Sequence, residues 1–304
     1  MANDVEENPG PTIYNVVDPT QTVCADFSQG DTRKFRQNAG KQCLAMSLTA
    51  IIHSHILDVD TWDTSLLNHI LYAGNDLYTF ISNSVKKSYL LLTDVPEMVS
   101  VFDKIYHLEY SDSLAGDLFI ENTNLPYYSL EHALRDLFYG SQLSYQHCML
   151  TINCNTIAIF KTSDVNFKIF DSHSRDSYGI LHPFGKCVSI SVEGIDNLII
   201  YLQNTVPRGD DVPFEIKGVT VELANCEIGK ETGIAILSGK VANKRLETAR
   251  NYKKNKRAVE TEAAREIRLE SDRKYHELKK ARETDLARKR RLENNKNCHK
   301  FKKA

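Results

Sequence analysis

The stretch SQGDTRKFRQNAGKQCLAMSLTAII (residues 28–52) places Cys43 between a polar loop and an apolar run. From Leu44 onward the apolar residues recur at helical spacing, which predicts a helix that opens near Gln42. A sulfur in the first turn of a helix lies at the positive end of the helix dipole, where the thiolate is favoured. Cys43 is therefore a candidate nucleophile. A buried structural thiol is the alternative, because free cysteines are often buried.

A thiolate works as a catalytic nucleophile when a base lies within reach and a third group orients that base. The block FDSHSRDSYG contains Asp171 and His173, two residues apart in a stretch that reads as a strand. Side chains two apart in a strand project from the same face, so the carboxylate can hold the imidazole in one tautomer. These two residues are the predicted base and its orienting group. Arg175 and Asp176 are interpreted as a pair that fixes the following loop.

Acyl transfer also requires a hydrogen-bond donor at the position where the carbonyl oxygen becomes negative. Gln29 lies fourteen residues before Cys43, on the approach to it, and is the first candidate for this role. Gln42, next to the cysteine, is the second candidate. His147 and Cys148 are adjacent in a predicted strand, where neighbouring side chains face opposite ways, so we do not expect them to form a working pair.

The elements that must position these residues indicate an α+β domain over residues 20–205. Helical periodicity follows Cys43 and returns within residues 61–80, and a short helix is expected over residues 195–205. Turn residues separate three stretches that read as strands, which are HCMLTINCNTIAIF (147–160), NFKIFDSHS (166–174) and KCVSISV (186–192).

The composition is that of an ordinary soluble protein, with 41% hydrophobic and 26% charged residues. No apolar run approaches the length of a membrane span, and the sequence lacks a secretory signal. The seven cysteines are scattered and never form a CxxC pair, which argues against a disulfide framework or a zinc site. We therefore expect reduced thiols in an intracellular, non-secreted protein with no cofactor, no metal and no membrane partner.

Charge is distributed unevenly along the chain, whose formal net charge is −2. Residues 1–239 hold 15 Lys+Arg and 30 Asp+Glu, whereas residues 240–304 hold 23 Lys+Arg and 10 Asp+Glu. The basic part has neither proline nor glycine from Ala242 onward, and it repeats every 23 residues with Arg-Leu-Glu at the start of each copy. We predict an extended, highly charged α-helical tail over residues 240–304, joined to the domain by a Pro/Gly-containing connector with some strand propensity at residues 206–239.

The first two copies of this repeat share basic residues and a tyrosine, which can contact nucleic-acid phosphates and stack on bases. The tail is therefore predicted to bind DNA or RNA. A plain solvated helix and a contact with an acidic protein are the alternatives. The candidate residues are Arg250, Tyr252, Lys253, Lys254, Arg273, Lys274, Tyr275, Lys279 and Lys280.

The glutamine, the G-x-Q-C-x-x-x-S-L segment and the later D-S-H strand together resemble the herpesvirus large-tegument-protein cysteine peptidases, which are deubiquitinases, and related domains of large viruses and mobile elements. The resemblance covers roughly residues 24–205. It implies a papain-like fold with Cys43 as nucleophile, His173 as base, Asp171 as its orienting group and Gln29 as oxyanion donor. It also implies ubiquitin or ubiquitin-like conjugates as partners.

Two further resemblances concern the ends of the chain. DVEENPGP resembles the end of the 2A-type ribosome-skipping peptides, which assigns residues 1–11 to such a peptide and implies that the bond between Gly10 and Pro11 is not formed. The 23-residue unit resembles the score-and-three-amino-acid peptide repeats, a helical DNA-binding array. The first of these resemblances implies a viral or mobile-element protein, and for such a protein the expected intracellular location is the host cytoplasm or nucleus.

Two functions from different classes are therefore open. The first is an enzyme, a cysteine peptidase that cleaves ubiquitin conjugates, with processing of a viral polyprotein as the alternative substrate. The second is a binding protein that tethers DNA and carries an inactive peptidase-like scaffold. The sequence leaves the oligomeric state open.

Overall fold

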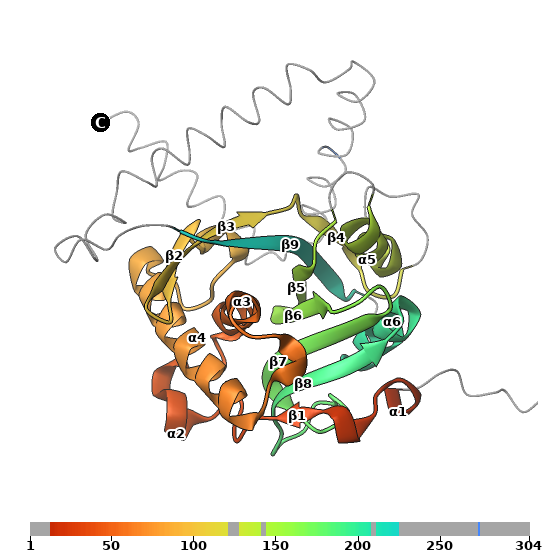
Figure 1. Ribbon diagram of the computed structural model, residues 1–304, viewed down its shortest axis with the longest axis horizontal. Helices are drawn as coiled ribbons and strands as arrows, with labels where there is room; N and C mark the ends of the chain where they lie inside the picture. Colours follow the sequence, from red (N-terminus) through yellow and green to blue (C-terminus); the bar gives the residue numbers. More distant parts are fainter. Residues whose placement is uncertain (1–12, 121–127, 141–143, 208–210, 225–272, 274–304) are drawn as a thin grey trace, which may run out of the picture. The chain divides into compact units, whose positions relative to one another are not determined.

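The structure is a computed structural model that describes residues 13–120, 128–140, 144–207, 211–224 and 273 (Figure 1). The strands of these residues are β1 (Val23–Cys24), β2 (Met98–Val101), β3 (Lys104–Tyr110), β4 (Leu114–Asp117), β5 (His147–Ile152), β6 (Asn155–Lys161), β7 (Asn166–Arg175), β8 (Lys186–Glu193) and β9 (Pro213–Leu223). They form one sheet in the order β1-β8-β7-β6-β5-β9-β3-β2, with β4 beside β9. The strand pairs recorded for the described residues are antiparallel.

Helices of different length lie between groups of strands along the chain. The α-helices are α1 (Ile13–Val16), α2 (Thr32–Phe35), α3 (Cys43–Ser54), α4 (Thr64–Val85), α5 (Leu130–Tyr139) and α6 (Ile195–Asn204). The short 3-10 helices are η1 (Pro19–Gln21), η2 (Arg36–Asn38), η3 (Val59–Thr61) and η4 (Leu92–Asp94). The predicted helices after Cys43, within residues 61–80 and over residues 195–205 are confirmed as α3, α4 and α6.

Helices cover both faces of the sheet (Figure 1). On one face, α3 and α4 share a hydrophobic cluster with Phe160 of β6 and Phe170 of β7. On the other face, α5 and α6 share a second cluster with Ile159 and Ile169 of the same two strands. Successive side chains of a strand point to opposite faces, so neighbouring residues enter different clusters. The central strands are buried on both sides, and the expected α+β class is confirmed.

The stretch 147–160, predicted as a single strand, is a hairpin of β5 and β6. The two strands meet at a two-residue turn of Asn153 and Cys154, whose φ angles are 47° and 66°. Left-handed conformation at both central residues is the geometry of a type I′ turn, which matches the twist of paired strands. Asparagine tolerates this conformation, whereas cysteine gives no sequence signal for it. The single-strand prediction was therefore wrong at the turn.

Residues 206–239, expected as a connector, contribute a long strand to the sheet. In β9, Gly218 pairs with Cys148 of β5, and Val221 pairs with Leu108 of β3. The sheet therefore continues beyond residue 205, where the sequence was expected to leave the folded domain. Pro213 stands at the first residue of β9, a position where proline is tolerated, although in the sequence it suggested a linker.

Helices α3 and α4 approach each other closely at Gly74. A Cβ atom at this position would lie 2.7 Å from the Cα atom of Met46 in α3. Only glycine permits that separation without a shift of one helix. The contact matters for the candidate site because Cys43, at the start of α3, lies one turn before Met46.

The ribosome-skipping prediction (Gly10 and Pro11) and the predicted nucleic-acid-binding residues, apart from Arg273, lie outside the described residues. Apart from Arg273, the residues of the predicted helical tail (240–304) also lie outside the described part of the chain. Among the described residues, no helix is long and apolar enough to cross a membrane.

Candidate active site

The candidate site lies where β6 and β7 part. The two strands pair from Lys161 and Phe167 as far as Ala158 and Phe170. Beyond that point β7 no longer pairs with β6. The backbone N–H of Gln29 donates to the carbonyl oxygen of Ser172 in β7 at 2.8 Å. The split in the sheet leaves room for the first residue of α3.

Cys43 occupies this split, and its partner is His173. The imidazole of His173 lies beside the thiol of Cys43, and each group shifts the pKa of the other. On its other side the imidazole bonds Asp171, whose Oδ1 lies 2.6 Å from Nδ1 of the ring. The structure therefore brings the three predicted residues into one chain of thiol, imidazole and carboxylate. This arrangement is that of cysteine–histidine peptidases.

Asp171 is buried, with 2% of its surface exposed, and several donors hold its carboxylate. Its Oδ1 also accepts from the backbone N–H of His173 at 2.8 Å, and its Oδ2 accepts from Nε of Arg175 at 2.8 Å. Burial by itself raises the pKa of Asp171, but the charges of Arg175 and His173 outweigh burial and lower it. The carboxylate is therefore ionised wherever the imidazole titrates.

The pKa of the His173 imidazole is raised, and the pKa of the Cys43 thiol is lowered. Burial lowers the pKa of His173, but the charge and hydrogen bond of Asp171, with the contact to Cys43, raise it to about 9. Burial raises the pKa of Cys43, but the hydrogen bond and charge of His173 outweigh burial and lower it. A raised imidazole pKa beside a lowered thiol pKa favours the imidazolium–thiolate pair over the neutral pair.

Arg175 was interpreted as part of a loop-fixing pair, and the structure divides that pair. Asp176 does fix the loop, because its Oδ1 accepts from the backbone N–H groups of Tyr178 and Ile180 at 2.9 Å. Arg175 instead contacts Asp171 and donates to the carbonyl oxygen of Thr205, after α6, at 3.1 Å. Its role in holding the carboxylate was missed, because residues four apart in a regular strand are separated by about 13 Å, and the bulge of β7 between Asp171 and Arg175 shortens that distance.

The two glutamine candidates differ in what their amides contact. Gln42 is fully buried, and its Nε2 donates to Oδ1 of Asn75 in α4 at 3.3 Å. The same Oδ1 accepts from Nδ2 of Asn38 at 3.0 Å, so α4 holds the segment that leads into Cys43. Within the described residues, the buried Oε1 of Gln29 has no hydrogen-bond partner. Gln42 therefore has a structural partner, and Gln29 remains the first candidate for the oxyanion role, which would fall to its amide nitrogen rather than to this oxygen.

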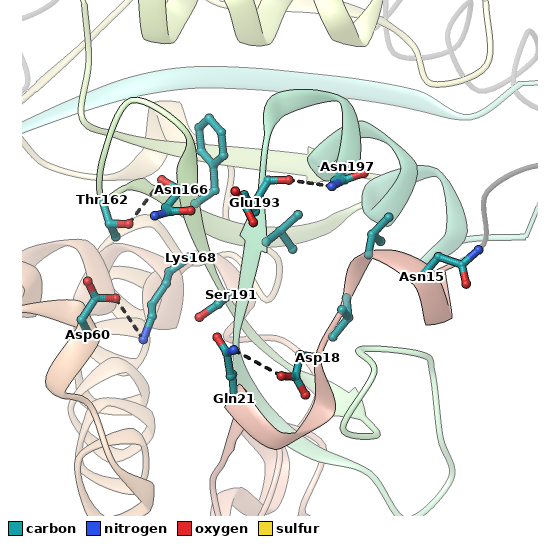
Figure 2. A pocket seen from close by; sticks show the side chains of 14 residues that line it. Asn15, Asp18, Gln21, Asp60, Thr162, Asn166, Lys168, Ser191, Glu193 and Asn197 are labelled. Atoms are coloured by element: carbon teal, nitrogen blue, oxygen red, sulfur yellow. Dashed lines mark hydrogen bonds and ion pairs between the residues drawn. The ribbon is translucent and has the colours of Figure 1, made fainter.

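A polar pocket of about 460 Å³ lies at the other end of β7, near its first residues. Figure 2 shows Lys168 extended toward Asp60, with a distance of 3.2 Å between Nζ and Oδ1. Nζ also donates to the carbonyl oxygen of Val59 at 3.2 Å. The charge of Lys168 is thus compensated by protein groups, and none of the predicted catalytic residues lines this pocket.

With this geometry in place, comparison with known proteins identifies the family. Residues 24–224 match the sequence profile of the family described as "Herpesvirus tegument protein, N-terminal conserved region", and the chain belongs to this family. The match includes the strand β9, in keeping with its place in the sheet. A comparison with curated protein sequences gave no match.

A solved structure supports the same fold. It is the ubiquitin-specific protease encoded by the murine cytomegalovirus tegument protein M48, in complex with a ubiquitin-based suicide substrate. The TM-score is 0.57 with 19% sequence identity, and the match covers 68% of this chain and 88% of that chain. The described domain therefore has the α+β fold of a viral tegument ubiquitin-specific protease.

Proposed function

We propose that this protein is a cysteine peptidase that cleaves ubiquitin or a ubiquitin-like protein from its conjugates. The observation that carries the proposal is the grouping of Cys43, at the start of α3, with His173 and Asp171 of β7. The family membership and the ubiquitin-based substrate bound to the M48 protease support ubiquitin as the partner.

The proposed reaction begins with the thiolate of Cys43. Its sulfur attacks the carbonyl carbon of the scissile amide and forms a C–S bond, while negative charge passes to the carbonyl oxygen. The amide of Gln29 and the backbone N–H of Cys43 donate to that oxygen. The imidazolium of His173 then protonates the leaving amine as the C–N bond breaks. Water, with its proton taken by His173, hydrolyses the thioester.

The test is covalent labelling with a ubiquitin probe that carries a cysteine-reactive group at its C-terminus. The full chain should be labelled at Cys43, and Cys43→Ala should remove the label. Cys154→Ala is the matched control, because Cys154 is exposed and lies near Cys43 but has no base beside it in the described structure. This control should be labelled like the wild type.

Failure to label, in a chain whose Cys43 still reacts with iodoacetamide, would redirect the proposal to another substrate such as a viral polyprotein. Failure of both reactions would favour the second reading, in which the peptidase-like domain is an inactive scaffold and the protein tethers DNA.

The basic repeats support a separate proposal, nucleic-acid binding by residues 240–304. The observation behind it is the charge contrast of 23 Lys+Arg with 10 Asp+Glu in this segment, together with its 23-residue period. Deletion of residues 240–304 should abolish binding to DNA and RNA and leave probe labelling intact. Full nucleic-acid affinity in the truncated chain would exclude the proposal.

A further inference from the structure

The edge of β6 at Thr156 is open toward the candidate site. The hairpin closes through the pair Ile152 and Asn155, so the next pair, Thr151 and Thr156, is a non-hydrogen-bonded pair. In such a pair the backbone N–H and C=O groups point away from the partner strand. They would normally bond the strand on the other side, but β7 pairs with β6 only from Ala158 onward.

Helix α3, and not β7, contacts the edge of β6 at Thr156. Cys43 and Ser47 are four residues apart, so they lie on one face of the helix. The hydroxyl of Ser47 donates to the carbonyl oxygen of Thr156 at 3.1 Å, and the thiol of Cys43 donates to the carbonyl oxygen of Cys154 at 3.8 Å. The sulfur therefore has the tip of the hairpin on one side and His173 on the other.

The backbone N–H and the hydroxyl of Thr156 are the hydrogen-bond donors available to the sulfur of Cys43. Thr156 is 3% exposed, and its hydroxyl lies 2.9 Å from the hydroxyl of Thr151. When Thr151 donates in that pair, the hydroxyl proton of Thr156 is free to point elsewhere. Burial raises the pKa of Cys43, and hydrogen bonds from the backbone and hydroxyl of Thr156 are among the contacts that lower it again.

We propose that Thr156 is a further catalytic residue, whose backbone N–H and hydroxyl donate to the sulfur of Cys43 and stabilise it as a thiolate. The inference rests on the proposed role of Cys43 as nucleophile. In the neutral state the S–H group donates to the carbonyl oxygen of Cys154. On ionisation the proton moves to Nε2 of His173, and the sulfur becomes an acceptor for the two donors of Thr156.

The experiment measures the rate at which iodoacetamide alkylates Cys43 in the full chain as a function of pH, with the modified peptide quantified by mass spectrometry. Thr156→Val keeps the shape of the side chain and removes the hydroxyl. The apparent pKa of Cys43 should rise by about one unit, since a hydrogen bond to a charged group contributes about that much. Below the pKa, the alkylation rate should fall about tenfold.

The matched control is Thr151→Val. It removes a hydroxyl of the same hairpin to which the proposal assigns no contact with the sulfur. Its alkylation profile should stay within a few tenths of a unit of the wild type. If Thr156→Val unfolds, the pair Thr156→Ser and Thr156→Ala replaces it. These two variants differ only in the hydroxyl, and serine should restore the lower pKa.

Equal profiles for serine and alanine at this position, or an equal shift in Thr151→Val, would overturn the inference and assign Thr156 to packing alone. Alkylation requires no ubiquitin, so a chain that fails to cleave ubiquitin can still confirm or overturn the role of Thr156. The two proposals therefore fail separately.

Discussion

Two regions of the same sheet combine a cysteine with a histidine, and only one of them has the environment of a nucleophile. At the split between β6 and β7, Cys43 lies beside His173, whose pKa is raised to about 9. In β5, Cys148 is adjacent to His147 in sequence, but burial raises the pKa of Cys148, and burial together with His55 lowers the pKa of His147 to about 4. The difference shows that the partner decides the outcome, since burial opposes the charged form in both regions.

The geometry of strands explains why adjacency fails. His147 and Cys148 project to opposite faces of β5, so the imidazole contacts Phe160 edge-on and lies tilted against His55, while the thiol enters the cluster under α5 and α6. Cys43 and His173 come from a helix and a strand that are far apart in sequence. Their side chains meet only because α3 docks where the sheet opens.

The largest expected effect separates the two cysteines. Cys43→Ala should abolish ubiquitin-probe labelling and conjugate cleavage, because the nucleophile is lost. Cys148→Ala should keep both reactions and lower the free energy of unfolding by about 1 kcal/mol, the loss of a small buried side chain. Rates and urea unfolding curves of both variants decide the comparison. Loss of labelling in a folded Cys148→Ala protein would contradict it.

The second prediction concerns Asp171→Asn, which should make the pKa of His173 more like that of His147. In Asp171→Asn the charge that raises the pKa of His173 is gone, while burial remains, so the pKa should fall to or below its ordinary value. The catalytic rate should fall on the order of 10³–10⁴-fold. NMR titration of the imidazole checks the pKa. Asp176→Asn, in the neighbouring loop, is the control and should cost far less activity.

A smaller effect tests the oxyanion donor. Gln29→Ala should lower kcat on the order of 10²–10³-fold, as expected for one lost donor to the transition state, with little change in the alkylation of Cys43. Gln42→Ala should instead disturb the start of α3, because it breaks the contact with Asn75. Its alkylation rate and its unfolding midpoint should both change. The opposite pattern would exchange the roles of the two glutamines.

The smallest effect concerns stability in the second region. Because the pKa of His147 is about 4 in the folded state, the unfolded chain binds its proton first as pH falls below 6.5. The free energy of unfolding should therefore decrease between pH 6.5 and 4, by on the order of 1–3 kcal/mol from this residue. His147→Phe should flatten the decrease in urea titrations. An unchanged slope, equal to that of the exposed control His132→Gln, would contradict the assignment.

Residues with strong local signals were predicted well from the sequence. The apolar spacing after Cys43 fixes a helix, and the two-residue spacing of Asp171 and His173 places both side chains where they meet. Arg175 and Asn75 carried no comparable signal. Their contacts depend on a bulge in β7 and on the packing of α4 at Gly74, and neither is visible in periodicity.

The sequence by itself thus determined the α+β class, the helix that begins at Cys43 and the candidate nucleophile, base and oxyanion donor, because each follows from short-range spacing and side-chain chemistry. The tertiary structure alone decided that β9 joins the sheet, that β6 and β7 part at the site, and that Thr156 contacts α3 through Ser47. Those features depend on which strand edges remain unpaired, and pairing between distant segments is set by the packing of the whole domain rather than by local propensity.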